Sequence, residues 1–139
     1  MKVLIDTNVL LDYLTKRGPY YINARQIIQQ CAANDLDGFV AAHSIVDAFY
    51  IMRKTVSVEK RREYLLQICK IITIIGIDER KLTAALSNLS FKDFEDCLQN
   101  ECGIEVGVDY IITRNEKDFS ESGITVVTPE KFLQQAREK

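Results

Sequence analysis

Carboxylate, hydroxyl and amide side chains recur in this sequence where a predicted strand has just ended. Asp6, Thr7 and Asn8 directly follow the short apolar run Lys2–Ile5, and Asp47 lies one turn into the helix expected after the second strand. Carboxylate and amide oxygens are the ligands that hard divalent cations prefer. The first chemistry to consider is therefore metal-assisted chemistry at a strand end.

Two later segments carry residues of the same kind. Asp96 lies in the helix expected before the fourth strand, and Asn115 and Asp118 lie in the turn after it. Ligand sites in open α/β sheets lie outside the carboxyl ends of the strands, so oxygens from four segments should converge on one edge. The only cations expected close to this edge are Arg114 and Lys117. Because crowded carboxylates repel one another unless a cation lies among them, the cluster predicts Mg²⁺ or Mn²⁺.

Each acid also has a purely structural interpretation. Asp6 and Asp93 are of the type that caps helices. Asp47 matches the acidic partner of Ser44 in a capping box, and Asp118 matches a turn residue. The convergence of several acids, rather than any one of them, favours the metal site.

Apolar strands alternate with amphipathic helices along the chain. The expected strands are Lys2–Ile5, Phe39–Ala42, Ile74–Ile77, Val108–Thr113 and Ile124–Val127. The expected helices are Val9–Leu14, Ile22–Ala33, Ser44–Met52 with Ser44 as its cap, Val58–Ile72, Glu79–Leu86, Asp93–Cys102 and a last helix opened by Thr128–Pro129. Parallel strands need crossover helices, so we expect an α/β fold: three α/β/α layers around a parallel sheet of about five strands.

The composition limits the classes of protein to which this chain can belong. A chain of 139 residues, 47% hydrophobic and 27% charged, fits one globular domain spanning 1–139. Its formal charge of -2 gives no general basic field for nucleic acid. The lack of a long apolar run or a signal-peptide pattern predicts a cytoplasmic protein without a membrane partner. The four cysteines have no CxxC spacing, so we expect them to be buried, reduced thiols.

Several enzyme classes lack their residues here. The sequence has no GxGxxG, GxxxxGK[ST] or GxSxG, which excludes the dinucleotide, P-loop and nucleophile-elbow motifs. A phosphatase of the haloacid dehalogenase type needs a second Asp where this chain has Asn8. A receiver-like domain would need Asp78 as phosphate acceptor, but a helix-start pattern follows it and no partner Lys is evident.

Four ordered motifs resemble those of a PIN-domain nuclease, most of all the small VapC-type toxins. They are Val3–Asp12, Asp47 in the helix after Ala41–Ser44, Asp93–Leu98 and Ile111–Phe119. By this resemblance, Asp6, Asp47 and Asp96 take the family's first three acidic positions. Thr7 or Asn8 takes its supporting polar position.

The chain departs from the family pattern at two places. The second acid is usually Glu, and Asp47 is one methylene shorter. The fourth acid usually follows a Thr-x pair, where this chain has Asn115, with Asp118 one turn later as the alternative. Asp6 and Asp96 are expected to hold the metal, and Thr113 or Asn8 to orient the attacking water.

The resemblance implies a divalent-metal-dependent ribonuclease, the toxin of a toxin-antitoxin pair, with an antitoxin partner and a homodimeric state. The alternative is a catalytically weak PIN-like domain that binds RNA or protein. Cations that could contact phosphate are Lys54, Arg61, Arg62, Arg114 and Lys117. Large apolar residues crowd the second and third helical segments, where they fill the core or form an interface: Tyr20, Tyr21, Phe49, Tyr50 and Met52.

Overall fold

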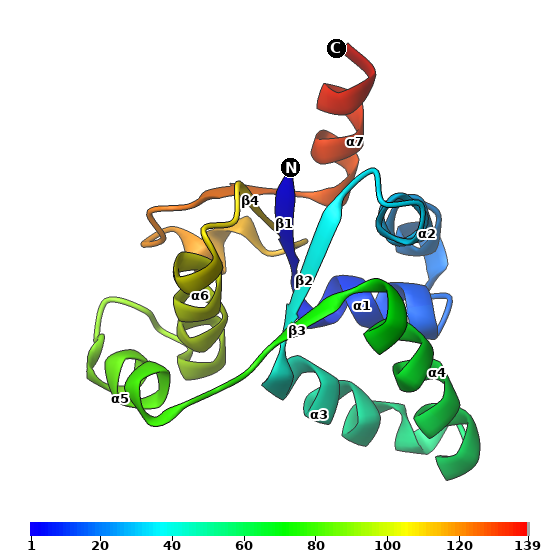
Figure 1. Cartoon of the computed structure of the whole chain (residues 1–139), viewed down its shortest axis with the longest axis horizontal. Helices are drawn as coiled ribbons and strands as arrows, with labels where there is room; N and C mark the ends of the chain where they lie inside the picture. Colours follow the sequence, from blue (N-terminus) through cyan, green and yellow to red (C-terminus); the bar gives the residue numbers. More distant parts are fainter. Residues whose placement is uncertain (139) are drawn as a thin grey trace.

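A five-stranded parallel sheet forms the centre of the protein (Figure 1), in a computed structural model that describes residues 1–138. The strand order is β3-β2-β1-β4-β5. Leu4 on β1 pairs in register with Phe39 on β2 and with Ile111 on β4, so β1 occupies the middle. The strands are β1 (Lys2–Ile5), β2 (Asp37–Ala41), β3 (Thr73–Ile75), β4 (Tyr110–Ile112) and β5 (Thr125–Val127).

Helices follow every strand except β4, which leads into a short 3₁₀ turn. The α-helices are α1 (Thr7–Leu14), α2 (Tyr21–Ala32), α3 (Ala42–Ile51), α4 (Val58–Ile71), α5 (Glu79–Ser87), α6 (Phe94–Val106) and α7 (Pro129–Glu138). The 3₁₀ turns are η1 (Gly18–Tyr20), η2 (Met52–Lys54) and η3 (Glu116–Phe119). Strands and helices thus fall where the sequence pattern predicts them, within a few residues at each end.

Alternating strand residues divide the core into two clusters, one on each face of the sheet. Val3 and Ile5 face the cluster that includes helices α1 to α4 and α7, whereas Leu4 faces the cluster with α5 and α6. All three side chains are fully buried. Figure 1 shows α5 and α6 on one side of the strands and α1, α2 and α4 on the other. The predicted three-layer α/β/α architecture is confirmed.

The helix ends show which predicted caps are used. The side chains of Asp78 and Asp93 accept hydrogen bonds from the backbone N–H groups of Lys81 and Asp96, at 3.0 Å in both cases. Asp78 is therefore a helix cap. Together with the strand order, which differs from the 2-1-3-4-5 order of receiver-like folds, this argues against the receiver interpretation.

The predicted cap of α3 is wrong. The helix begins at Ala42, directly after β2, and Ser44 is fully buried within its first turns. The Ser44 hydroxyl accepts a hydrogen bond from the hydroxyl of Thr7 at 2.7 Å instead of capping the helix. A contact with a distant segment has thus replaced the local one.

The prediction of four buried cysteines also needs correction. Cys31, Cys97 and Cys102 are buried, and burial raises the pKa of the Cys31 and Cys102 thiols to about 11. Cys69 is exposed on α4, where it lines a groove with residues of α3. The helical period places this residue one position after the buried Ile68, beyond the apolar face.

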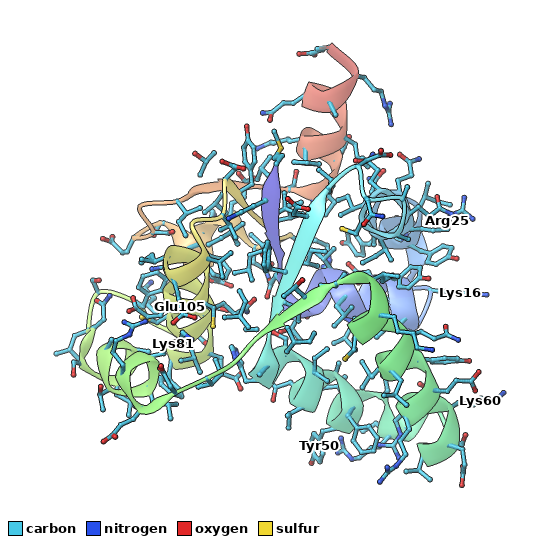
Figure 2. The ribbon with its side chains drawn as sticks, in the orientation of Figure 1. Lys16, Arg25, Tyr50, Lys60, Lys81 and Glu105 are labelled. Carbon is cyan, nitrogen blue, oxygen red and sulfur yellow. The ribbon has the colours of Figure 1, made fainter. Side chains whose placement is uncertain are left out.

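Helices α5 and α6 are joined by a buried lysine. The ammonium group of Lys81 donates to the carbonyl of Gly76 at 2.6 Å and pairs with Glu105 at 2.8 Å. Figure 2 shows the labelled Lys81 and Glu105 side chains meeting between the two helices. Only 3% of Lys81 is exposed, so this pair fixes the position of α6, the helix that carries Asp96. Within residues 1–138, no helix is long and apolar enough to cross a membrane.

Candidate metal centre at the carboxyl edge of the sheet

The strand order reverses between β1 and β4. From β1 the chain continues to β2 and β3 on one side, whereas β4 and β5 lie on the other. The loops leaving β1 and β4 therefore diverge at their carboxyl ends, where ligand sites form in open α/β sheets. Asp6 follows β1 and Thr113 follows β4, so both lie at this reversal.

Neutral donors hold the carboxylate of Asp6. Its Oδ1 accepts a hydrogen bond from Gln99 at 2.9 Å, and its Oδ2 accepts one from the Thr113 hydroxyl at 2.7 Å. Asp6 occupies the N-cap position of α1, but its side chain does not cap that helix. With only 5% of the residue exposed, Asp6 is a buried carboxylate fixed by two elements distant in sequence.

Carboxylates from α6 and η3 surround Asp6. Burial raises the pKa of Asp96 to about 7, with smaller contributions from the charges of Asp93, Asp6, Asp118 and Glu95. These contributions mean that all five side chains act on one region. The predicted acids Asp6, Asp96 and Asp118 therefore share an electrostatic environment.

Asp47 on α3 faces the start of α6. Partial burial raises the pKa of Glu95 to about 7, followed by a hydrogen-bonding contact with Asp47 and by the charges of Asp47 and Asp93. Asp47 thus joins the acidic edge through Glu95. We did not single out Glu95 from the sequence, although it directly precedes Asp96.

No cation of the described chain compensates these acids. Within residues 1–138, no ion pair involves Asp6, Asp47, Asp96 or Asp118. Burial lowers the pKa of His43, in opposition to the charge of Asp47, so its imidazole is no standing counter-charge here. A bound divalent cation would supply the missing charge.

Buried polar atoms without partners lie at the same edge. In the described part of the chain, the Gln99 Oε1 and both ring nitrogens of His43 are buried and have no hydrogen-bond partner. The opposite end of the Gln99 amide holds Asp6. Orphaned polar atoms beside a carboxylate cluster fit a site that a hydrated ion would complete.

The donor set fits Mg²⁺ or Mn²⁺ better than a softer metal. Across residues 1–138, no three His, Cys, Asp or Glu side chains are arranged to enclose an ion by themselves. Mg²⁺ keeps several of its waters and is commonly held by one or two carboxylates. Asp6 and Asp96 are the candidate ligands for an open oxygen site of this kind.

The loop after β4 is fixed by its own side chains. Thr113 is fully buried, and its hydroxyl oxygen accepts a hydrogen bond from the N–H of Asn115 at 3.0 Å while its proton goes to Asp6. The guanidinium of Arg114 turns away and makes two hydrogen bonds to the buried Asp12, at 2.7 and 3.2 Å. Asn115 and Asp118 both remain exposed.

Thr7 and Asn8 are the first two residues of α1, directly after Asp6. Both are half-buried in the first turn of α1, and the Thr7 hydroxyl is bound to Ser44 on α3. Thr7 therefore joins the helix that carries Asp6 at its start to the helix that carries Asp47.

Of the residues missed in the sequence, Gln99 carried a usable signal. It lies three positions after Asp96 on one helix and so shares its face. Asp12 carried none, because its buried pairing with Arg114 joins residues 102 positions apart.

Two of the predicted phosphate contacts have other partners. Arg61 donates to the backbone carbonyls of Val56 and Phe49, at 3.1 and 2.9 Å, and its guanidinium lies 4.4 Å from the Phe49 ring centre. Arg114 is held by Asp12. Lys54, Arg62 and Lys117 remain exposed.

Comparison with known proteins agrees with this geometry. Residues 2–117 match the PIN domain family. Ribonuclease VapC1 of Aquifex aeolicus (strain VF5) is 27% identical over 137 residues, covering 96% of this chain and 94% of that protein.

Solved structures share the fold. A toxin-antitoxin complex from Klebsiella pneumoniae superposes with a TM-score of 0.68 at 24% identity, covering 91% of this chain and 97% of that chain. VapBC-1 from nontypeable Haemophilus influenzae gives a TM-score of 0.69 at 15% identity, covering 94% and 99%. The chain belongs to the PIN domain family, and the resemblance seen in its four motifs is confirmed.

The raised pKa of Asp96 predicts how the stability of the metal-free protein depends on pH. A carboxyl whose pKa rises on folding stabilises the folded state while protonated, and this contribution is lost as the pH rises through the folded pKa. With an ordinary value of 3.8 and a folded value of about 7, the melting temperature in EDTA should fall between those pH values. Thermal unfolding across this range measures the effect.

Asp96→Asn should flatten that dependence and melt at a higher temperature than the parent at pH above about 7. Asp35→Asn, at an exposed aspartate before β2 on the opposite edge, is the matched control and should leave the slope unchanged. An equal slope in the parent and in Asp96→Asn would contradict the assignment of Asp96 to this cluster.

Proposed function

We propose that the chain is a ribonuclease that uses a divalent cation, Mg²⁺ or Mn²⁺, to hydrolyse phosphodiester bonds in RNA. The observation that carries this proposal is a set of carboxylates, at the strand reversal of a PIN-family sheet, with no ion-pair partner among residues 1–138. The similarity to Ribonuclease VapC1 of Aquifex aeolicus supports the same activity. We further propose that residues 1–139 form a single PIN domain that acts in the cytoplasm.

Asp6 and Asp96 are the proposed metal ligands. When bound, the cation lowers the pKa of a coordinated water and offsets the charge that develops on the phosphate. Asp6 is held in place for this by Gln99 and by Thr113. Because the Thr113 proton is committed to Asp6, we assign it a positioning role and leave orientation of the attacking water to Asn8.

Asp47 and the turn with Asn115 and Asp118 complete the proposed site. Asp47 contributes negative charge from α3, together with Glu95 on α6. Asp118 contributes charge toward Asp96 from η3. Thr7 supports this arrangement through Ser44.

Cleavage of single-stranded or looped RNA should require the cation and the two proposed ligands. Chelation should abolish it, and Asp6→Asn or Asp96→Asn should lower the rate by more than about 100-fold, since even outer-shell changes at metal sites cost roughly 10–100-fold. The measurement is RNA cleavage under matched concentrations of Mg²⁺ or Mn²⁺, with Asp35→Asn as control. If either variant cuts as fast as the parent, the site assignment is wrong.

The fourth position of the site can be decided by metal affinity. Asp118→Ala should weaken binding of Mn²⁺ more than Asn115→Ala, because an amide oxygen is a poorer ligand for a hard cation than a carboxylate. Isothermal titration calorimetry of both variants measures this difference. The reverse order would place Asn115, rather than Asp118, in the site.

We propose two protein partners, a second copy of the chain and an antitoxin. The large apolar residues of the second and third helical segments divide between core and surface: Met52 is buried, Tyr21 and Phe49 are half-buried, and Tyr20 and Tyr50 are exposed. A groove of about 410 Å³ between α3 and α4 adds the exposed Val46 and Leu66. The exposed apolar side chains of this groove are typical of interfaces.

The neighbour described as a toxin-antitoxin complex supports the second partner. An antitoxin segment that placed an Arg or Lys among the acids would replace the charge of the metal and inhibit the enzyme.

Expression of the chain alone should slow cell growth, and co-expression of its small partner should restore it. Light scattering of the purified protein should give the mass of a dimer, and Leu66→Ser, which removes exposed apolar surface without touching the acids, should shift it toward monomer. A parent that stays monomeric at high concentration excludes the dimer. Normal growth of cells making folded, metal-loaded protein contradicts the toxin role and leaves the nuclease activity open.

A further inference from the structure

A second cavity opens beside the acidic edge, on the side of β5. It has a volume of about 400 Å³, within the range of small-ligand sites. Its lining comes from η1 and α2, the loop after β4 and the start of α7, and includes Tyr20, Asn23, Arg114, Asn115 and Thr128. We propose that this cavity binds one base of the RNA strand, next to the bond that is cleaved; this inference rests on the proposed ribonuclease function.

The cavity is coupled to the acidic edge through one short loop. Asn115 lines it, and the N–H of Asn115 is bound to the hydroxyl of Thr113, which holds Asp6. A nucleotide bound here therefore contacts Asn115, two residues after the Thr113 that holds the proposed metal ligand Asp6. That is the place of a nucleotide adjoining the scissile phosphate.

Arg114 and Tyr20 form a rigid stack in the wall of this cavity. The guanidinium carbon lies 3.9 Å from the centre of the Tyr20 ring, and two hydrogen bonds to Asp12 prevent it from rotating. Tyr20 keeps 46% of its surface exposed. Aromatic rings and guanidinium planes are the surfaces on which unpaired bases stack.

The charges favour a base over a phosphate as the occupant. Arg114 is the only cation in the lining, and its guanidinium is paired with Asp12, which also lies 3.8 Å from Arg17, while Glu130 adds a negative charge at the rim. The remaining polar groups are neutral amides and a hydroxyl, from Asn23, Asn115 and Thr128. Such groups match the neutral donors and acceptors on a base edge.

A different cavity provides the competing site for the test. It is larger, about 540 Å³, and is lined by Tyr13, Tyr21 and Tyr64 together with Lys16 and Lys70. None of the proposed catalytic residues lines it. In Figure 2 the labelled Lys16 lies on the opposite side of the strands from α6. Binding there would be driven by backbone charge and would show no dependence on one base.

The experiment is a cycle of two changes, one in the protein and one in the RNA. Affinities of a short single-stranded oligoribonucleotide, intact or lacking one base at each position in turn, are measured in EDTA for the parent and for Tyr20→Ala. Removing the base that stacks on Tyr20 should weaken parent binding by about 5- to 150-fold. The same removal should have little effect on Tyr20→Ala, because the two changes delete one contact.

Two further variants separate stacking from general damage. Tyr20→Phe keeps the ring and should bind like the parent. Tyr50→Ala removes another exposed tyrosine that has an arginine, Arg53, 3.7 Å from its ring centre, but this tyrosine is on α3 and does not line the cavity. It should leave affinity and its dependence on each base unchanged.

The outcomes distinguish this inference from the ribonuclease proposal. Equal losses of affinity in the parent and in Tyr20→Ala at every position overturn the base site. A variant of the larger cavity, Lys16→Ala, is measured alongside, and a loss of affinity in this variant alone also overturns it. The same holds if the parent shows no measurable binding. If the parent cleaves RNA with Mg²⁺ or Mn²⁺ but shows no coupling, the ribonuclease proposal stands and the base site falls. If the coupling appears at one or two adjacent positions but nothing is cleaved, the base site stands without the nuclease.

Discussion

Mutual repulsion among carboxylates at the carboxyl edge of the sheet is the constraint to which the surrounding structure responds. Asp6 is almost fully buried and must be held, yet a cation holding it would neutralise the site. Two neutral donors, Gln99 and Thr113, hold it instead. The nearest arginine, Arg114, directly follows Thr113 and is bound by Asp12, which lies within α1 and is fully buried. Asp12 thus keeps a permanent cation away from the acids and leaves their charge available for a metal.

The second requirement is an exact register of α6 against β1. Gln99 can reach Asp6 only if α6 lies close to the sheet, and the helix achieves this at Gly103, one turn later on the same face. A Cβ atom at Gly103 would lie 2.9 Å from the Cδ1 of Ile124 and 3.1 Å from the Cγ2 of Val108, so both side chains would have to shift to accept it. The pair between Lys81 and Glu105 fixes the far end of the same helix. The packing of α6 against its neighbours therefore sets the position of the Gln99 amide at the site.

Local patterns in the sequence predict the elements and the acids that follow them. Asp6 was identifiable because it ends an apolar strand, and Asp93 and Asp78 because caps are local features. Ser44 was misassigned because its partner, Thr7, lies 37 residues earlier. The pairing of Asp12 with Arg114 and the contact of Gln99 with Asp6 were equally out of reach, since a one-dimensional pattern does not record which strands become neighbours. What the sequence could not supply is thus the long-range contacts that hold the acids in place, whereas most of the acids, and Thr113 beside them, were identifiable from local patterns.

The contact between Asp47 and Glu95 bears on the shorter acid that this chain has at the second position. An aspartate on α3 reaches one methylene less far than the glutamate usual in the family, but Glu95 approaches it from α6 and has the longer side chain. Partial burial raises the pKa of Glu95 to about 7, and the contact with Asp47 and the charges of Asp47 and Asp93 add to this rise. A divalent cation at Asp6 and Asp96 would stabilise the ionised form of Glu95 and favour the loss of its proton. The charge on this side of the site is therefore linked to metal binding, and neither carboxyl can be assigned its role without the other.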